Sequence, residues 1–201
     1  MKRFFRGRCR MVKSVHTVLE VDIPDNVEVS VDGMKVRVSG PLGKLEKDFS
    51  HARSITIKKE NNKVVLEAYY PKKGQLAVLG SVRSHIKNMI LGVTQGYKYV
   101  MKIVYAHFPI SVKFVPGTRE VFIENFLGEK SSRKTQVLPG VNVKIEKDDI
   151  ILTGIDIEAV GQSAANIQQA TKIKEKDPRI FQDGIYVYRK YVGEKLLWKI
   201  L

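Results

Sequence analysis

The sequence has a single cysteine, Cys9, and no Asn-x-Ser/Thr acceptor for glycosylation. One cysteine cannot form an internal disulfide bond, so neither feature indicates secretion. The longest uncharged stretch, residues 159–171, spans only 13 residues and contains Gln, Ser and Asn, whereas a membrane-spanning helix needs about 20 apolar residues. We therefore expect a protein of a reducing compartment, with no transmembrane segment and no membrane partner.

The residue patterns that support catalysis or metal binding are also missing. The four histidines, at positions 16, 51, 85 and 107, show no His-x-x-x-His spacing, and neither Cys-x-x-Cys nor Gly-x-Ser-x-Gly occurs. Residues 40–44 contain Gly-x-x-Gly, which in one RNA-binding module clamps the nucleic-acid backbone between two helices. We favour a simple turn between two strands here. The sequence predicts no enzymatic activity, no catalytic residues, no metal site and no cofactor.

Acidic residues are few for the number of basic ones. Asp and Glu number 21 against 35 Lys and Arg, which gives a formal net charge of +14. This excess of positive charge indicates a polyanionic partner. The first 13 residues hold six basic residues and no acid. We interpret them as a basic N-terminal extension, either an RNA-binding arm or an organelle transit sequence.

An internal repeat organises the rest of the chain. In residues 27–40, valines alternate with polar residues on both sides of an Asp-Gly turn, and the same pattern returns 114 positions later in residues 141–154. Each hairpin is followed by an amphipathic helical stretch, residues 76–93 and 160–170. The sequence therefore predicts an α+β fold of two similar tandem domains from an internal duplication. Each domain is an antiparallel sheet with one packed helix.

The boundaries of these domains follow from where each pattern stops. We expect the basic N-terminal extension in residues 1–13, the first α+β repeat in 14–94, the second in 95–190, and a C-terminal tail in 191–201. Within the second repeat, positive charge gathers in two loop-like segments, residues 129–134 and 172–179. Long basic side chains in loops can reach phosphates, although a solvated charged surface is the alternative interpretation.

A series of motifs resembles one known family. The motifs are IP before the first hairpin with its GPLG turn, SHIKNMILGVTQGY followed by YAHFPI, then NFLGEK, PGV, GIDIE, SAANIQQAT and DGIYV. In this order, over roughly residues 15–190, they resemble the universal large-subunit ribosomal protein family called L-six. Eukaryotic cytoplasmic members of that family are known as large-subunit protein nine, and YAHFPI and NFLGEK resemble that branch. The two chain ends lie outside the resemblance.

The resemblance implies a structural constituent of the large ribosomal subunit that supports translation. Members of the family bind large-subunit ribosomal RNA near the stalk base, close to the region where translation factors dock, and beside other large-subunit proteins. It also implies a cytoplasmic protein that passes through the nucleolus during assembly and forms no homo-oligomer. The alternative is a basic interaction module that binds an acidic protein or a membrane surface.

The residues expected to contact ribosomal RNA all lie in the second repeat. Most are long basic side chains in loop-like segments, and three mark an expected helix start, whose backbone amides would suit a phosphate. The candidates are Lys130, Arg133, Lys134, Lys172, Lys174, Lys176 and Arg179, together with Gly161, Gln162 and Ser163 at the helix start.

Overall fold

The computed structural model describes residues 15–174, 176–177 and 179–200. The basic N-terminal extension predicted for residues 1–13 lies outside the described residues. By its contacts the described chain divides into two compact units. The first consists of residues up to Asp25, Val29–Arg37 and Glu46–Lys87, and the second of Asn26–Glu28, Val38–Leu45 and the chain from Asn88 onward. The division thus falls within a helix, a few residues before the position expected from the sequence.

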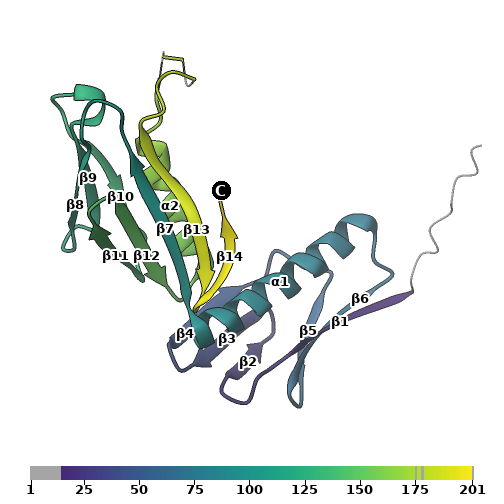
Figure 1. The fold of residues 1–201 in the computed structure, drawn as a ribbon. Helices are drawn as coiled ribbons and strands as arrows, with labels where there is room; N and C mark the ends of the chain where they lie inside the picture. The colour runs from purple at the N-terminus through teal and green to yellow at the C-terminus, as the bar shows by residue number, and fades with distance from the viewer. Residues whose placement is uncertain (1–14, 175, 178, 201) are drawn as a thin grey trace, which may run out of the picture. The chain divides into compact units, whose positions relative to one another are not determined.

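The elements of the first half are six strands followed by one long helix (Figure 1). In order they are β1 (His16–Asp22), β2 (Glu28–Asp32), β3 (Lys35–Gly40), β4 (Gly43–Asp48), β5 (Thr56–Glu60), β6 (Lys63–Tyr69) and α1 (Lys73–Gln95). They form two three-stranded sheets, with strand orders β1-β6-β5 and β2-β3-β4. The turn expected within residues 40–44 joins β3 to β4, and no helix flanks it.

The helix α1 has the apolar stripe that its sequence predicts. Leu79, Val82, Ile86 and Ile90 are buried at three- and four-residue spacing, because one side of a helix returns about every 3.6 residues. Leu76, the first residue of the expected stripe, is 39% exposed. Within the first unit, the Arg83 Nε donates a hydrogen bond of 3.2 Å to the backbone oxygen of Glu20 in β1.

The second half contains a larger sheet and a shorter helix. Its elements are β7 (Tyr97–Val104), β8 (Ser111–Val115), β9 (Glu120–Glu124), the 3-10 helix η1 (Phe126–Gly128), β10 (Arg133–Gln136), β11 (Val141–Glu146), β12 (Asp149–Gly154), α2 (Ile157–Ala170), β13 (Gly184–Val192) and β14 (Lys195–Lys199). Five strands form an antiparallel sheet in the order β11-β12-β7-β13-β14, and β10-β9-β8 form a second sheet.

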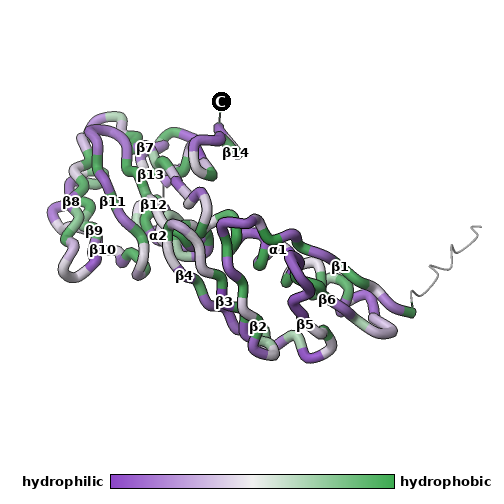
Figure 2. The backbone as a smooth tube through the Cα atoms, turned by 90° about the horizontal axis from the view of Figure 1, so that it is seen from below, coloured by the Kyte–Doolittle hydropathy of each residue, from purple (hydrophilic) through white to green (hydrophobic). Residues whose placement is uncertain are grey.

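One hydrophobic core joins α2 to both sheets of the second unit. Met101 of β7, Ile123 of β9, Leu152 of β12 and Ile167 of α2 are fully buried in it. Hydrophobic and hydrophilic stretches alternate along most strands in Figure 2, as expected for strands with one buried face. The α+β fold of antiparallel sheets with one α-helix in each half is confirmed.

The C-terminal segment belongs to the large sheet. The strand β13 runs from Gly184 to Val192, and β14 pairs with it as the edge strand of the five. Residues 191–199, which the sequence suggested as a tail, therefore extend the second unit. The pairing of β13 with β7 shifts register between Val187 and Arg189, which indicates a β-bulge.

The repeated hairpin glycines have a packing role in both halves. A Cβ atom at Gly154 would lie 2.7 Å from a methyl of Val160, and one at Gly40 would lie 2.7 Å from a methyl of Val93. Both distances are too short for carbon atoms in contact. Each hairpin thus ends in a glycine because a valine of the following helix packs directly against its backbone.

We predict that Gly154→Ala destabilises the protein by about 1–3 kcal/mol, because the added methyl overpacks the contact with Val160. Gly161→Ala is the matched control, since a Cβ there meets only a Tyr99 ring atom at 3.9 Å. Replacing a glycine inside a helix should stabilise by about 0.5–1 kcal/mol. Urea denaturation measures both, and equal effects of the two substitutions would contradict the packing explanation.

Candidate nucleic-acid interface

The connection between α2 and β13 carries four of the predicted basic residues, and we call its described residues, 172–174, 176–177 and 179–182, the basic loop. Both ends of the basic loop are fixed by buried polar residues. Thr171, 3% exposed, accepts a 3.1 Å hydrogen bond from the Ile185 backbone amide. Asp183, 4% exposed, accepts one of 3.1 Å from the Ala106 amide. Hydrogen bonds to other elements therefore hold the two residues that flank the basic loop.

Two of the predicted lysines in the basic loop border an open hollow of about 730 Å³. Lys172 and Lys176 line it together with Phe181 and Tyr186. The Lys176 ammonium lies 4.8 Å from the centre of the Phe181 ring, a cation–π contact that holds the charge at the rim. The other predicted side chains of the loop, Lys174 and Arg179, are exposed. The hollow combines positive charge with an aromatic surface.

Arg133 lies close to the basic loop, but its guanidinium is engaged inside the protein. Its Nε and Nη2 donate to the two carboxylate oxygens of Glu129, at 2.9 and 2.6 Å. Its Nη1 donates to the backbone oxygens of Ala170 and Lys172, at 2.9 and 3.1 Å. The guanidinium also lies 4.2 Å from the centre of the Phe126 ring. Arg133 therefore fastens the start of β10 to the end of α2 and the beginning of the basic loop.

The positive charges around Glu129 favour the ionised form of its carboxyl group. Its hydrogen bonds with Arg133 hold the pKa of the carboxyl below its ordinary value, and the nearby positive charges of Arg133 and Lys176 act in the same direction. Partial burial opposes this shift without reversing it. Glu129 is consequently ionised at neutral pH, and the structure brings Lys176 near the Arg133 network.

Lys134 is adjacent to Arg133 in sequence and points the other way. Successive side chains of a strand point to opposite faces of its sheet. Arg133 pairs with the buried Ile123, whereas Lys134 pairs with Phe122, and its ammonium lies 5.2 Å from that ring centre. Lys134 thus lies on the outer face of the three-stranded sheet. Lys130 is exposed in the turn before β10, on the same segment as Glu129.

The expectation that Gly161, Gln162 and Ser163 form a helix start is wrong. The helix α2 begins at Ile157, and Asp156 is its N-cap, with a side chain that accepts a 2.9 Å hydrogen bond from the Glu158 amide. Ser163 is fully buried and donates to the Ala159 backbone oxygen at 2.7 Å. It also accepts from the Leu138 amide at 3.0 Å. Gln162 is exposed and hydrogen-bonds Asn166 on the same helix.

The sequence-based prediction missed a second group of basic residues, on the five-stranded sheet. Lys98 and Lys102 are exposed on β7 and alternate with the buried Tyr99 and Met101. That alternation was visible in the sequence and placed both lysines on the side away from the core. Arg189 of β13 belongs to the same side, but only because of the bulge that precedes it.

Neither a metal cluster nor a membrane span is found in the part of the chain that the structure describes. No three His, Cys, Asp or Glu side chains there are grouped so that they could hold a metal ion. Likewise, neither described helix is long and apolar enough to cross a membrane.

We predict that Arg133→Ala lowers the free energy of unfolding by about 1–3 kcal/mol, because it leaves Glu129 and two backbone oxygens without their donor. The Glu129 pair stabilises the fold above the ordinary carboxyl pKa and loses its contribution as the pH falls through the lowered pKa. The effect of the substitution should accordingly shrink below about pH 4. Thermal denaturation across this range measures it.

Lys134→Ala is the matched control, since it removes one positive charge from the neighbouring position on the exposed face. It should change stability by no more than about 0.5 kcal/mol at any pH. If Arg133→Ala were equally neutral, the internal network would have no structural role.

Comparisons with known proteins match both halves of this chain. A family model described as Ribosomal protein L6 matches residues 23–96 and 109–184, one segment in each half of the chain. Large ribosomal subunit protein uL6 of Aeropyrum pernix is 52% identical over 182 residues, which cover 90% of this chain and 99% of that protein. The protein of the same name from Ignicoccus hospitalis is 54% identical over 186 residues, with coverage of 90% and 99%. The chain therefore belongs to the ribosomal protein L6 family, a structural and non-enzymatic family of the ribosome.

Proposed function

We propose that this chain is a structural constituent of the large ribosomal subunit that binds large-subunit ribosomal RNA through the basic loop. The observation that carries the proposal is the loop itself. Thr171 and Asp183, which flank it, are held by hydrogen bonds to other elements, and it presents Lys172 and Lys176 at the rim of a hollow. Its relatives are named as large-subunit proteins, which supports this partner.

The lysines of the basic loop suit phosphate groups. Lys172, Lys174, Lys176 and Arg179 form no ion pair with any carboxylate in the described chain, so their charges are available to a ligand. Contacts from long basic side chains to phosphates fix the position of a protein on nucleic acid without reading its sequence. Arg133 acts indirectly in this proposal, because it holds the loop's first residues in place. Lys130 and Lys134 supply charge from the neighbouring turn and strand.

The location on the subunit is part of the proposal. From the family resemblance we propose that the protein lies near the base of the stalk and the region where translation factors dock. There it would lie beside other large-subunit proteins on a cytoplasmic ribosome after assembly in the nucleolus, as a single copy. A basic module that binds an acidic protein or a membrane remains the competing function. Co-sedimentation with ribosomes after a salt wash supports the first function, and binding to acidic vesicles supports the second.

We predict that the logarithm of the affinity of the full chain for large-subunit ribosomal RNA falls linearly with the logarithm of the salt concentration, because binding releases counterions from phosphates. The double variant Lys172→Gln/Lys176→Gln should reduce the slope by about 1.4–1.8 units, at about 0.7–0.9 for each phosphate that is no longer neutralised. Filter binding across a series of salt concentrations measures the slope.

The control for this experiment removes two positive charges from the first unit, at positions distant in sequence from the basic loop. Lys35→Gln/Lys59→Gln changes two exposed lysines of the first unit and lowers the net charge equally. It should leave the slope within about half a unit of the unmodified protein. Equal reductions from both double variants would mean that overall charge, and not the basic loop, governs binding.

A further inference from the structure

The five-stranded sheet of the second unit has two faces of different character. The helix α2 packs against one of them and runs behind β7 and β13 in Figure 1. The side chains that alternate with the core positions point to the opposite face, which we call the open face. Lys98, Lys102, Lys144 and Lys199 are exposed there.

The strand register arranges the open face into three rows that run across the sheet. One row joins Asn142, Thr153, Lys98, Tyr191 and Leu196, in strand order from β11 to β14. The next joins Lys144, Ile151, Val100, Arg189 and Lys199. The third joins Glu146, Asp149, Lys102 and Tyr186, in strand order from β11 to β13. Every row carries at least one basic side chain, and the middle row carries three.

The β-bulge in β13 determines which side chains reach the open face. Regular alternation from the buried Ile185 would place Arg189 with the core and Lys190 on the open face. The register shift before Arg189 reverses this order. Lys190 instead lies 5.1 Å from the ring centre of Tyr99, a core residue, while Arg189 lies over Tyr188 at 4.8 Å. The bulge therefore adds a guanidinium to the lysines of the open face.

Each of the two acids of the open face has one partner within the protein, while the buried Oδ1 of Asp149 has no hydrogen-bond partner among the described residues. Glu146 is paired with Lys144, and Asp149 accepts a 3.0 Å hydrogen bond from the Tyr188 hydroxyl. Lys98, Lys102 and Lys199, by contrast, form no ion pair with a carboxylate of the described chain. The open face consequently has a net positive charge that the protein itself does not neutralise.

Two of the aromatic rings of the open face are covered by cations. The Lys98 ammonium lies 5.8 Å from the centre of the Tyr191 ring, and Arg189 covers Tyr188 in the same way. A nucleic-acid base would have to displace these cations before it could stack. What the face offers directly is N–H donors, and these match phosphate oxygens. Its chemistry favours the phosphodiester backbone over the bases.

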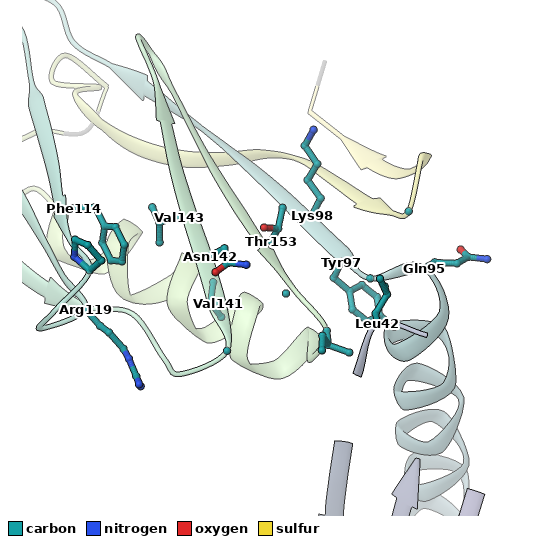
Figure 3. A pocket seen from close by; sticks show the side chains of 16 residues that line it. Leu42, Gln95, Tyr97, Lys98, Phe114, Arg119, Val141, Asn142, Val143 and Thr153 are labelled. Carbon is teal, nitrogen blue, oxygen red and sulfur yellow. The ribbon is translucent and has the colours of Figure 1, made fainter. Parts of the chain in front are cut away.

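One end of the open face borders a hollow that exposes backbone. Lys98, Thr153 and Asn142 line an open hollow of about 880 Å³ from neighbouring strands (Figure 3). Glycines at 96, 140, 154 and 193 contribute to the same lining. Of these four, Gly140 alone has open space where a side chain would stand, so a ligand backbone can approach the protein backbone closely at that position.

We propose that the open face is a second RNA-binding surface, which holds the phosphodiester backbone of a ribosomal RNA strand laid across β7, β12 and β13. The proposal takes its partner, large-subunit ribosomal RNA, from the proposed function, and it concerns a surface other than the basic loop. Lys98 and Lys102 are its principal contacts. Four residues apart on one strand, they lie about 13 Å from each other and so would reach different phosphates.

The test uses the full chain and large-subunit ribosomal RNA. The double variant Lys98→Gln/Lys102→Gln should reduce the salt-dependence slope by about 1.4–1.8 units. Lys98→Arg/Lys102→Arg should retain the slope, because it keeps both charges. The control Lys35→Gln/Lys59→Gln again removes two charges elsewhere, and circular dichroism checks that each variant is folded.

The outcomes separate this inference from the proposed function. If the Lys172→Gln/Lys176→Gln variant lowers the slope and the open-face variant does not, the basic loop binds RNA and the open face does not. If neither variant lowers it, the proposed function fails as well. A reduction by the open-face variant alone would support the open face and overturn the basic loop.

A second measurement identifies what lies on the open face in the assembled particle. A photo-cross-linking amino acid replaces Lys102 in the full chain, and large subunits that contain the variant are irradiated. We expect an adduct with ribosomal RNA. An adduct with another protein would show a protein-docking surface and overturn the inference, and so would the absence of any adduct at this position. The same amino acid at Lys59 provides the control.

Discussion

The packing of α2 across one face of the five-stranded sheet is the constraint on which the second unit depends. Ile167 of the helix and Leu152 of the sheet are fully buried in the core that results, and burial of such side chains contributes about 1.5–3 kcal/mol each. The close contact of Val160 with Gly154 sets how near the helix can lie. Both candidate interfaces follow from this packing, since the basic loop leaves the end of α2 and the open face is the side that α2 does not cover.

Positive charge in this protein serves two different purposes. Arg133 is committed to Glu129 and to backbone oxygens, so its charge stabilises the connection between β10 and α2. Lys172 and Lys176 have no such partner in the described chain and remain available to a ligand. An arginine suits the first task because its planar group donates several hydrogen bonds at fixed angles. A lysine at the end of a long, flexible side chain suits the second.

Two basic surfaces on one unit would bind RNA in complementary ways. The basic loop projects from anchors at Thr171 and Asp183 and can reach into a groove or between helices of RNA. The open face is broad and supported by five hydrogen-bonded strands, so it offers charges at fixed spacing. Long basic side chains position a protein on phosphates without reading base sequence, so both surfaces would suit recognition of a folded RNA through its backbone.

The sequence by itself determined the elements whose signal is local. Alternating valines specified the two hairpins, the spacing of Leu79, Val82 and Ile86 specified the buried side of α1, and the ordered motifs specified the family. The start of α2 at Ile157 also had a local signal, the N-cap Asp156, which the prediction overlooked. The basic segment after α2 lies in the connection to β13, as expected, whereas the segment expected as a loop in residues 129–134 ends in the strand β10, which begins at Arg133.

Tertiary structure alone decided which basic side chains are engaged inside the protein and to which face of a sheet each one points. Arg133 and Lys134 are adjacent basic residues, and only the pairing of β10 with β9 points the Arg133 side chain toward the core and the Lys134 side chain to the outer face of the sheet. The bulge that moves Arg189 to the open face arises from the register of β13 against β7, and β14 becomes a strand only by pairing with β13. Register and strand pairing depend on contacts between segments that are distant in sequence, so no short stretch of the sequence specifies them.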